Sequence, residues 1–211
     1  MKHFAAKFLT DSDKEKIKQS VKEAEKTTSG EIVPMIVSYS YTYPLANLRA
    51  GLIFGLIIGI AYALIFKNEN LWIFLAVFMI TLIIIHKIIE FIPPLKRLFI
   101  LKKEIEEEVQ EAAITSFYQS GLYKTRDETG VLIFISVFER KVWLLADKGI
   151  NSKIETGEWQ NIIDEIIKGI KTGKQADAIA DAVKKTGEKL SIHFPIKKDD
   201  TNELDNLIIK D

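Results

Sequence analysis

Two uninterrupted apolar runs lie in the middle of the chain, at Ala50–Phe66 and Leu71–Ile85, and only four residues separate them. A run of about 17 apolar residues is long enough to cross a bilayer as a helix. The second run is shorter, but it continues through His86–Ile92, where Lys87 can extend its amine toward the lipid headgroups. The pattern therefore predicts a two-helix transmembrane hairpin over residues 45–94. Two buried helices of a soluble core are the alternative, although neither run shows the polar face of a surface helix.

Basic residues beside the runs indicate how this hairpin is oriented, because cytoplasmic flanks of transmembrane helices are enriched in Lys and Arg. The tip of the hairpin has only Lys67, next to Glu69. The N-terminus lacks the long apolar core of a secretory signal peptide. We therefore expect a multi-pass protein of the inner (cytoplasmic) membrane with both termini in the cytoplasm. The basic residues at the flanks are Arg49, Lys87, Lys96, Arg97, Lys102 and Lys103.

Before the hairpin, the pattern predicts one helix and one strand. Ser12-Asp13-Lys14-Glu15 resembles a capping box, and apolar residues follow it at helical spacing as far as Ala24. Glu31–Tyr41 is rich in Ile, Val and Tyr, which is typical of a strand. Pro34 lies inside this strand and favours an edge position, since proline cannot donate to a sheet ladder.

After the hairpin, the chain alternates between helical and strand patterns. A strand–helix–strand unit is normally parallel, so the strands before and after the hairpin are expected to lie side by side. The sequence thus predicts an α/β fold, in which a sandwich of a small mixed sheet with helices on its faces is formed by residues 1–44 plus 95–211. The predicted elements are a helix over Leu95–Ser120, strands at Val131–Val137 and Val142–Ala146, helices over 159–170 and 176–190, and a loose, charged tail from Lys197.

Composition narrows the classes of function. Lys and Arg together number 29, as do Asp and Glu, so no basic excess indicates a nucleic-acid partner. The absence of cysteine excludes disulfides, thiolate nucleophiles and thiolate metal sites. There is no glycine-rich phosphate loop, and His3, His86 and His193 are too scattered to suggest a catalytic dyad. The expected partners are the lipid bilayer, a protein within the membrane, or a second copy of the chain.

The predicted topology brings acidic residues to one end of the sheet. If the first two strands are parallel, Glu31 lies near Asp127 and Glu128, and the returning strand delivers Asp147 to the same end. Carboxylate oxygens are the ligands that Ca²⁺ and Mg²⁺ prefer, and Arg126 and Lys148 stand beside them as ligands for phosphate. This predicts a metal–carboxylate site, whereas carboxylates that only cap helices or face water are the alternative.

The opposite end of the sheet must lie near the bilayer, because the first strand runs directly into the first apolar run. The interface residues predicted there could meet headgroups, or the tyrosines could pack in pairs on the strand and the charged residues could form an ordinary turn. These residues are Tyr39, Tyr41, Tyr43, Arg140 and Lys141.

Small residues recur every four positions in the first apolar run: Gly51, Gly55, Gly59 and Ala63. They line one ridge of a helix and would let another helix approach closely. The neighbour could be the second run of the same chain, which the short tip favours, or the same ridge of a second copy.

Several segments resemble the TPM-domain family. Thr125–Val142, continuing into Ala146–Ile150, resembles the strand–turn–strand core of this family, and Glu25 with Thr28–Ile32 resembles its first helix-to-strand junction. Ile192–Pro195 and Asn202–Asp205 resemble the C-terminal end of a membrane-embedded bacterial branch.

The resemblance implies an α/β sandwich. It also implies one of two roles, since some family members are credited with acid phosphatase activity and others are accessory subunits of ion channels. Asp147–Lys153 departs from the acidic end that this loop has in secreted members. We therefore expect a membrane protein whose cytoplasmic domain is an interaction or accessory module. The alternative is a metal-dependent phosphatase-like hydrolase that uses the carboxylates.

Overall fold

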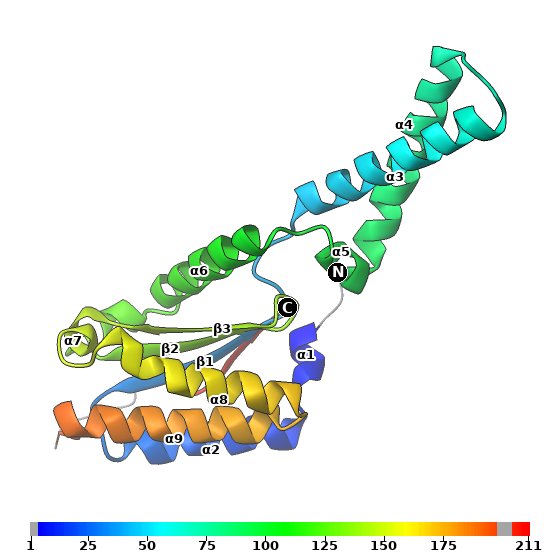
Figure 1. Ribbon diagram of the computed structural model, residues 1–211. Helices are drawn as coiled ribbons and strands as arrows, with labels where there is room; N and C mark the ends of the chain where they lie inside the picture. The colour runs from blue at the N-terminus through cyan, green and yellow to red at the C-terminus, as the bar shows by residue number, and fades with distance from the viewer. Residues whose placement is uncertain (1–3, 198–203) are drawn as a thin grey trace. The chain divides into compact units, whose positions relative to one another are not determined.

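The computed structural model describes residues 4–197 and 204–211, and these form two compact units (Figure 1). The hairpin unit holds residues 41–106. The sheet domain holds the described residues on either side of it. The sequence placed the division at residues 45 and 94, whereas the compact hairpin unit extends twelve residues further toward the C-terminus, from 94 to 106.

The sheet domain is built on four strands in the order β3-β2-β1-β4. The two central strands, β1 (Glu31–Val37) and β2 (Gly130–Ser136), are parallel, with Glu31 opposite Gly130. β3 (Lys141–Ala146) returns antiparallel to β2. The sheet is therefore mixed, and the parallel pairing predicted for the strands on either side of the hairpin is confirmed.

Helices cover both faces of this sheet, which confirms the predicted sandwich. Figure 1 shows α2 (Asp11–Glu25), α8 (Gln160–Lys171) and α9 (Gln175–His193) on one face and α6 (Lys102–Gln119) on the other. Every residue of β2 is buried, as its apolar sequence predicts for a strand covered on both sides. The core between the sheet and the three helices includes Ile32, Ile36, Ile133, Ile166 and Ile179.

The single helix predicted over Leu95–Ser120 is wrong, because the structure breaks it into α5 (Pro93–Arg97) and α6. The apolar pattern continues through the break and includes neither glycine nor proline, so periodicity alone could not reveal it. The carboxylate of Glu104 accepts a hydrogen bond from the Leu101 backbone nitrogen (3.2 Å), which satisfies one of the free amides at the start of α6.

The loose tail predicted from Lys197 is also wrong for the residues that the structure describes. Residues 208–210 form β4 (Ile208–Lys210), which pairs in parallel with Met35–Val37. This pairing explains how Pro34 is tolerated in an inner strand, since pairing on the β4 side begins only at the next residue. Residues 198–203 and His3 lie outside the described residues.

The remaining elements are short, apart from the two long helices of the hairpin unit. Short single turns carry too few residues for a periodic pattern, so the sequence did not predict them. They are α1 (Phe4–Phe8), η1 (Leu122–Lys124), α7 (Lys148–Asn151) and η2 (Thr156–Trp159), and the long helices are α3 (Pro44–Ile65) and α4 (Leu71–Phe91).

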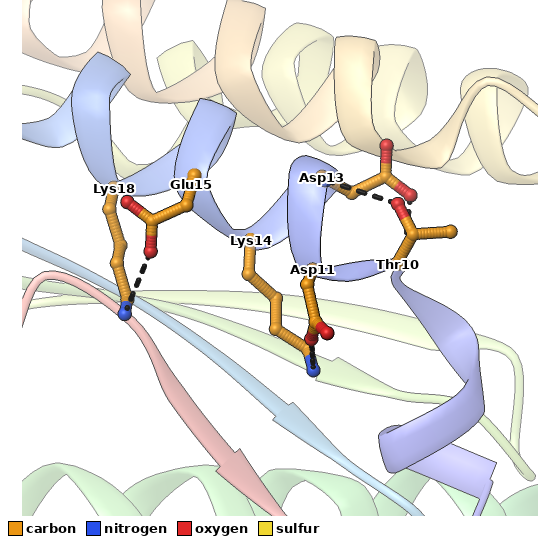
Figure 2. A network of polar contacts seen from close by, with 6 residues as sticks. All are labelled: Thr10, Asp11, Asp13, Lys14, Glu15 and Lys18. Atoms are coloured by element: carbon orange, nitrogen blue, oxygen red, sulfur yellow. Dashed lines mark hydrogen bonds and ion pairs between the residues drawn. The ribbon is translucent and has the colours of Figure 1, made fainter.

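The capping box of α2 lies two residues earlier than predicted. Thr10 is the N-cap; its hydroxyl accepts from the Asp13 backbone nitrogen (3.2 Å), and the Asp13 carboxylate accepts from the Thr10 nitrogen (2.9 Å) (Figure 2). Hydrogen bonds to the Asp13 carboxylate, first from the Thr10 backbone nitrogen and then from the Thr10 side chain, lower the pKa of Asp13. Both Ser12 and Thr10 are followed three residues later by an acidic side chain, and the sequence pattern alone does not distinguish them.

We expect Thr10→Ala to lower the free energy of unfolding by about 1 kcal/mol, because it removes an N-cap acceptor. For a chain of this size, that loss lowers the melting temperature by roughly 2–4 °C. Ser12→Ala is the matched control and should change it little. Thermal unfolding in detergent, followed by circular dichroism, measures both. A larger effect of Ser12→Ala would contradict the assignment of the cap.

Candidate functional site

The two helices of the hairpin unit expose their apolar side chains instead of burying them. In the most apolar stretch of each helix, only 22% of α3 and 6% of α4 is buried. Leu64, Ile65 and Trp72, close to the tip, are each at least 74% exposed. Helices of a soluble core would be mostly buried. Both helices are long and apolar enough to span a membrane, and lipid would cover the surface that they leave exposed.

The glycines of α3 face α4 of the same chain. A Cβ atom added to Gly51, Gly55 or Gly59 would lie 2.9–3.0 Å from Leu82, Phe78 or Phe74 respectively. All three glycines are buried, whereas Ala63 is half-buried near the tip. The structure thus fills the small-residue ridge with large side chains of α4, which is the intramolecular alternative of the two that the sequence left open.

Gly55→Leu should destabilise the hairpin, because its side chain would collide with both the ring and the backbone of Phe78. Overpacking of this kind costs about 1–3 kcal/mol. The melting temperature of the detergent-solubilised chain measures the loss. Ile57→Leu, at a position on α3 that is 56% exposed, is the matched control and should leave stability unchanged. Equal melting temperatures for the two variants would contradict this packing.

An ion pair ties the first turns of α3 to the start of α6 within the hairpin unit. The Arg49 guanidinium donates to both carboxylate oxygens of Glu104, with 2.7 Å between Nη1 and Oε2, and also to the Phe99 carbonyl (3.1 Å). This fork-to-fork geometry favours Arg over Lys. The hydrogen bonds from Arg49 hold the pKa of the Glu104 carboxyl below its ordinary value. We call this pair the Arg49–Glu104 clamp.

The clamp predicts a pH dependence of stability. Because the folded chain lowers the pKa of Glu104, the stabilisation is fully present above the ordinary glutamate pKa of about 4.3 and is lost as the pH falls through the lower folded value. Near neutral pH, Glu104→Gln should cost about 1 kcal/mol, since the pair is partly exposed and screened. The difference in melting temperature between the variant and the parent should shrink on acidification. A difference that is constant from pH 7 to pH 3 would contradict it.

At the acidic end of the sheet domain, the structure brings together the loops that the topology predicts. The Glu31 backbone nitrogen donates to the Thr129 carbonyl (3.1 Å), and the Asp147 nitrogen donates to the Gly130 carbonyl (2.9 Å). Gly149 lies so close to the next loop that an added Cβ would meet the Glu128 carbonyl oxygen at 2.6 Å. Glycine is therefore required at this position for the two loops to touch.

The acidic side chains of these loops have separate contacts. Asp147 caps α7, with its Oδ1 accepting from the Lys148 nitrogen (2.7 Å), while Asp127 Oδ2 forms an ion pair with Lys197 Nζ (2.6 Å). Glu31 is buried and Glu128 is exposed. Within residues 4–197 and 204–211, no three His, Asp or Glu side chains are arranged to hold a metal ion. The exposed Arg126 and Lys148 flank these loops.

One oxygen at this end stands out. Asp147 Oδ2 is buried and has no hydrogen-bond partner among the described residues. Buried carboxylate oxygens are normally satisfied, so this atom is the feature of the acidic end that most favours a ligand. The carbonyl oxygens of Asp127 and Glu128 lie beside Gly149, two residues after Asp147.

The residues predicted for the membrane interface follow β1 or lie at the turn between β2 and β3, and Tyr41 and Tyr43 belong to the hairpin unit. Tyr41 is exposed, and its ring packs edge-on against the buried Tyr43, with 5.4 Å between centroids. Tyr39 is half-buried. In the turn between β2 and β3, Arg140 is exposed with φ of 53°, and Lys141 is half-buried as β3 begins.

Two polar contacts were not predicted from the sequence. One lies in the turn between β2 and β3, and the other lies at the start of β1. Glu139 is fully buried in the β2–β3 turn, where it accepts from the Ser40 nitrogen (2.9 Å) and the Ser136 hydroxyl. Glu25 accepts from the Ile32 nitrogen and the Asn206 amide, both at 3.2 Å. In the sequence, Glu139 lies between an apolar and a basic residue, which is typical of an ordinary exposed turn. The sequence therefore did not indicate that its carboxylate is buried.

Comparisons with known proteins connect this fold to a family. The model of the TPM domain matches residues 97–189, which confirms the resemblance to that domain over this part of the chain. Among solved structures, the chain is similar to the NMR structure of the BA42 protein from the psychrophilic bacterium Bizionia argentinensis sp. nov.. The two share 23% identity with a TM-score of 0.61, over 97% of this chain and 96% of that one, which shows the fold alone. No curated protein matches the chain.

Proposed function

We propose that this chain, which carries a TPM domain, is an integral membrane protein whose sheet domain acts as an interaction or accessory module. The observation that carries the proposal is the apolar surface of α3 and α4, most of which is exposed in the structure. A bilayer would cover that surface, and a second protein in the same membrane, or another copy of the chain, would be within reach of the sheet domain. The hairpin would thus hold the module at the membrane surface.

The arrangement that we propose is multi-pass in the inner membrane, with both termini and the sheet domain in the cytoplasm. Its support is the distribution of charge, since basic residues gather at the ends of α3 and α4 that join the rest of the chain. Arg49, in the first turns of α3, is held there by the Arg49–Glu104 clamp.

Cysteine accessibility tests this topology, and the chain contains no cysteine that would interfere. We expect an impermeant thiol reagent to label Glu69→Cys, at the hairpin tip, in intact spheroplasts. Ile192→Cys, at a position 75% exposed on α9, should react only after the membrane is permeabilised. Labelling of Ile192→Cys but not of Glu69→Cys in intact spheroplasts would reverse the orientation.

A metal-dependent phosphatase-like hydrolase is the second candidate, and the buried, unpartnered Oδ2 atom of Asp147 is the observation that favours it. Ca²⁺ or Mg²⁺ would be the cofactor. Because the described side chains do not form a ligand set, Asp127, Glu128 or Glu31 would have to turn toward Asp147 before the cation could be held.

Calorimetric titration with Ca²⁺ and Mg²⁺ separates these two candidates. If the hydrolase proposal holds, Asp127→Asn combined with Asp147→Asn should weaken cation binding more than about tenfold, because each change removes a charged ligand. Asparagine keeps the capping geometry at position 147. Glu111→Gln, on the exposed face of α6, is the matched control. Identical titrations for all variants and the parent would leave no role for the acidic end in binding a cation.

A further inference from the structure

A cavity of about 410 Å³ lies in the sheet domain where β2 turns into β3. Apolar side chains from the β2–β3 hairpin and from α8 form its walls, among them Ile135, Val142, Ile167 and Ile170. Phe8 of α1 completes the wall. A volume of this size is within the range of small-molecule sites, roughly 300–1,000 Å³. The interior is therefore suited to a hydrocarbon group.

The polar part of this cavity carries one sign of charge. Arg140, Lys141 and Lys171 line it, and none of the lining residues is acidic. Arg140 and Lys171 are exposed, which places their charges at the solvent side of the cavity. An apolar interior with a cationic edge is complementary to an amphiphile whose polar group is an anion.

The chain itself connects this cavity to the membrane. Ser136 lines the cavity and pairs with Val37, the last residue of β1. Only residues 38–43 separate β1 from α3, so Val37 and the first residue of α3 are joined by no more than about 25 Å of extended chain. If α3 spans the membrane, a lipid is the amphiphile that is always within reach.

We propose that this cavity binds an anionic phospholipid of the membrane. One acyl chain lies between the β2–β3 hairpin and α8, and the phosphate lies at Arg140 and Lys171. The guanidinium can bind two phosphate oxygens at once, whereas the lysine acts as a point charge. This site goes beyond the proposed role of the domain, and lipid binding there would couple the sheet domain to the composition of the bilayer.

Photolabelling of the full chain in detergent tests the site. The probe is phosphatidylglycerol with a diazirine at the end of one acyl chain, and phosphatidylcholine with the same chain is the neutral comparison. We expect phosphatidylglycerol to label peptides that contain residues 135–142 or 167–171 at least fivefold more than phosphatidylcholine does. Both lipids carry the phosphate, but Arg140 and Lys171 repel the choline cation, and one unit-charge repulsion near 4 Å in water is worth roughly fivefold.

Two kinds of variant decide the outcome. Arg140→Ala with Lys171→Ala should lower labelling about tenfold or more, and Val137→Phe should lower it by filling the cavity while leaving the charges in place. Lys168→Ala with Lys174→Ala is the matched control, because both lysines are exposed and neither lines the cavity. Circular dichroism confirms that each variant is folded.

Three results would overturn the proposal. The first is equal labelling of the parent and the Arg140/Lys171 variant. The second is an equal loss of labelling in the Lys168/Lys174 control, which would indicate unspecific attraction to the basic surface. The third is label that is confined to α3 and α4. Because the lipid is supplied in detergent, failure here would not bear on whether the hairpin crosses a membrane in cells. A reversed orientation in the cysteine-accessibility test would likewise not contradict the proposal that this cavity binds a lipid.

Discussion

The exposed apolar surface of α3 and α4 is the constraint on which the rest of the structure depends. These helices pack on each other through Gly51, Gly55 and Gly59, and their outer faces remain uncovered by protein. Helix association gains little from the hydrophobic effect inside lipid, so close packing against small residues is the interaction suited to hold such a hairpin together. In the arrangement that we propose, lipid covers this surface, and the hairpin determines where the sheet domain works.

The hairpin interrupts the crossover between β1 and β2, yet these strands still pair in register along seven residues. Such an insertion requires contacts that define where the sheet domain ends and the hairpin unit begins. In the sheet domain, the buried Glu139 accepts a hydrogen bond from Ser40, the last residue before the hairpin unit. In the hairpin unit, the Arg49–Glu104 clamp joins α3 to the start of α6, where the chain leaves the hairpin. Each is a carboxylate that satisfies backbone or guanidinium donors, so the boundary is built from polar contacts on both sides.

Much of this fold could be predicted from the sequence, because long elements carry a clear pattern. The apolar run of β2 predicted a strand covered on both faces, and the two uncharged runs predicted the hairpin helices. The break between α5 and α6 was hidden because apolar residues continue through it, and β4 has too few residues for any pattern. At the acidic end, topology placed the loops of Asp127 and Asp147 correctly. The directions of their side chains depend on local partners, Lys197 and the α7 amides, which spacing does not encode.

The most direct test of this account is alkaline carbonate extraction of membranes from cells that produce the chain. If α3 and α4 lie within the bilayer, the full chain stays in the membrane pellet. A chain in which a flexible linker replaces residues 45–94 then appears in the soluble fraction with its sheet intact. Release of the full chain by carbonate would contradict the central claim that α3 and α4 lie within the bilayer.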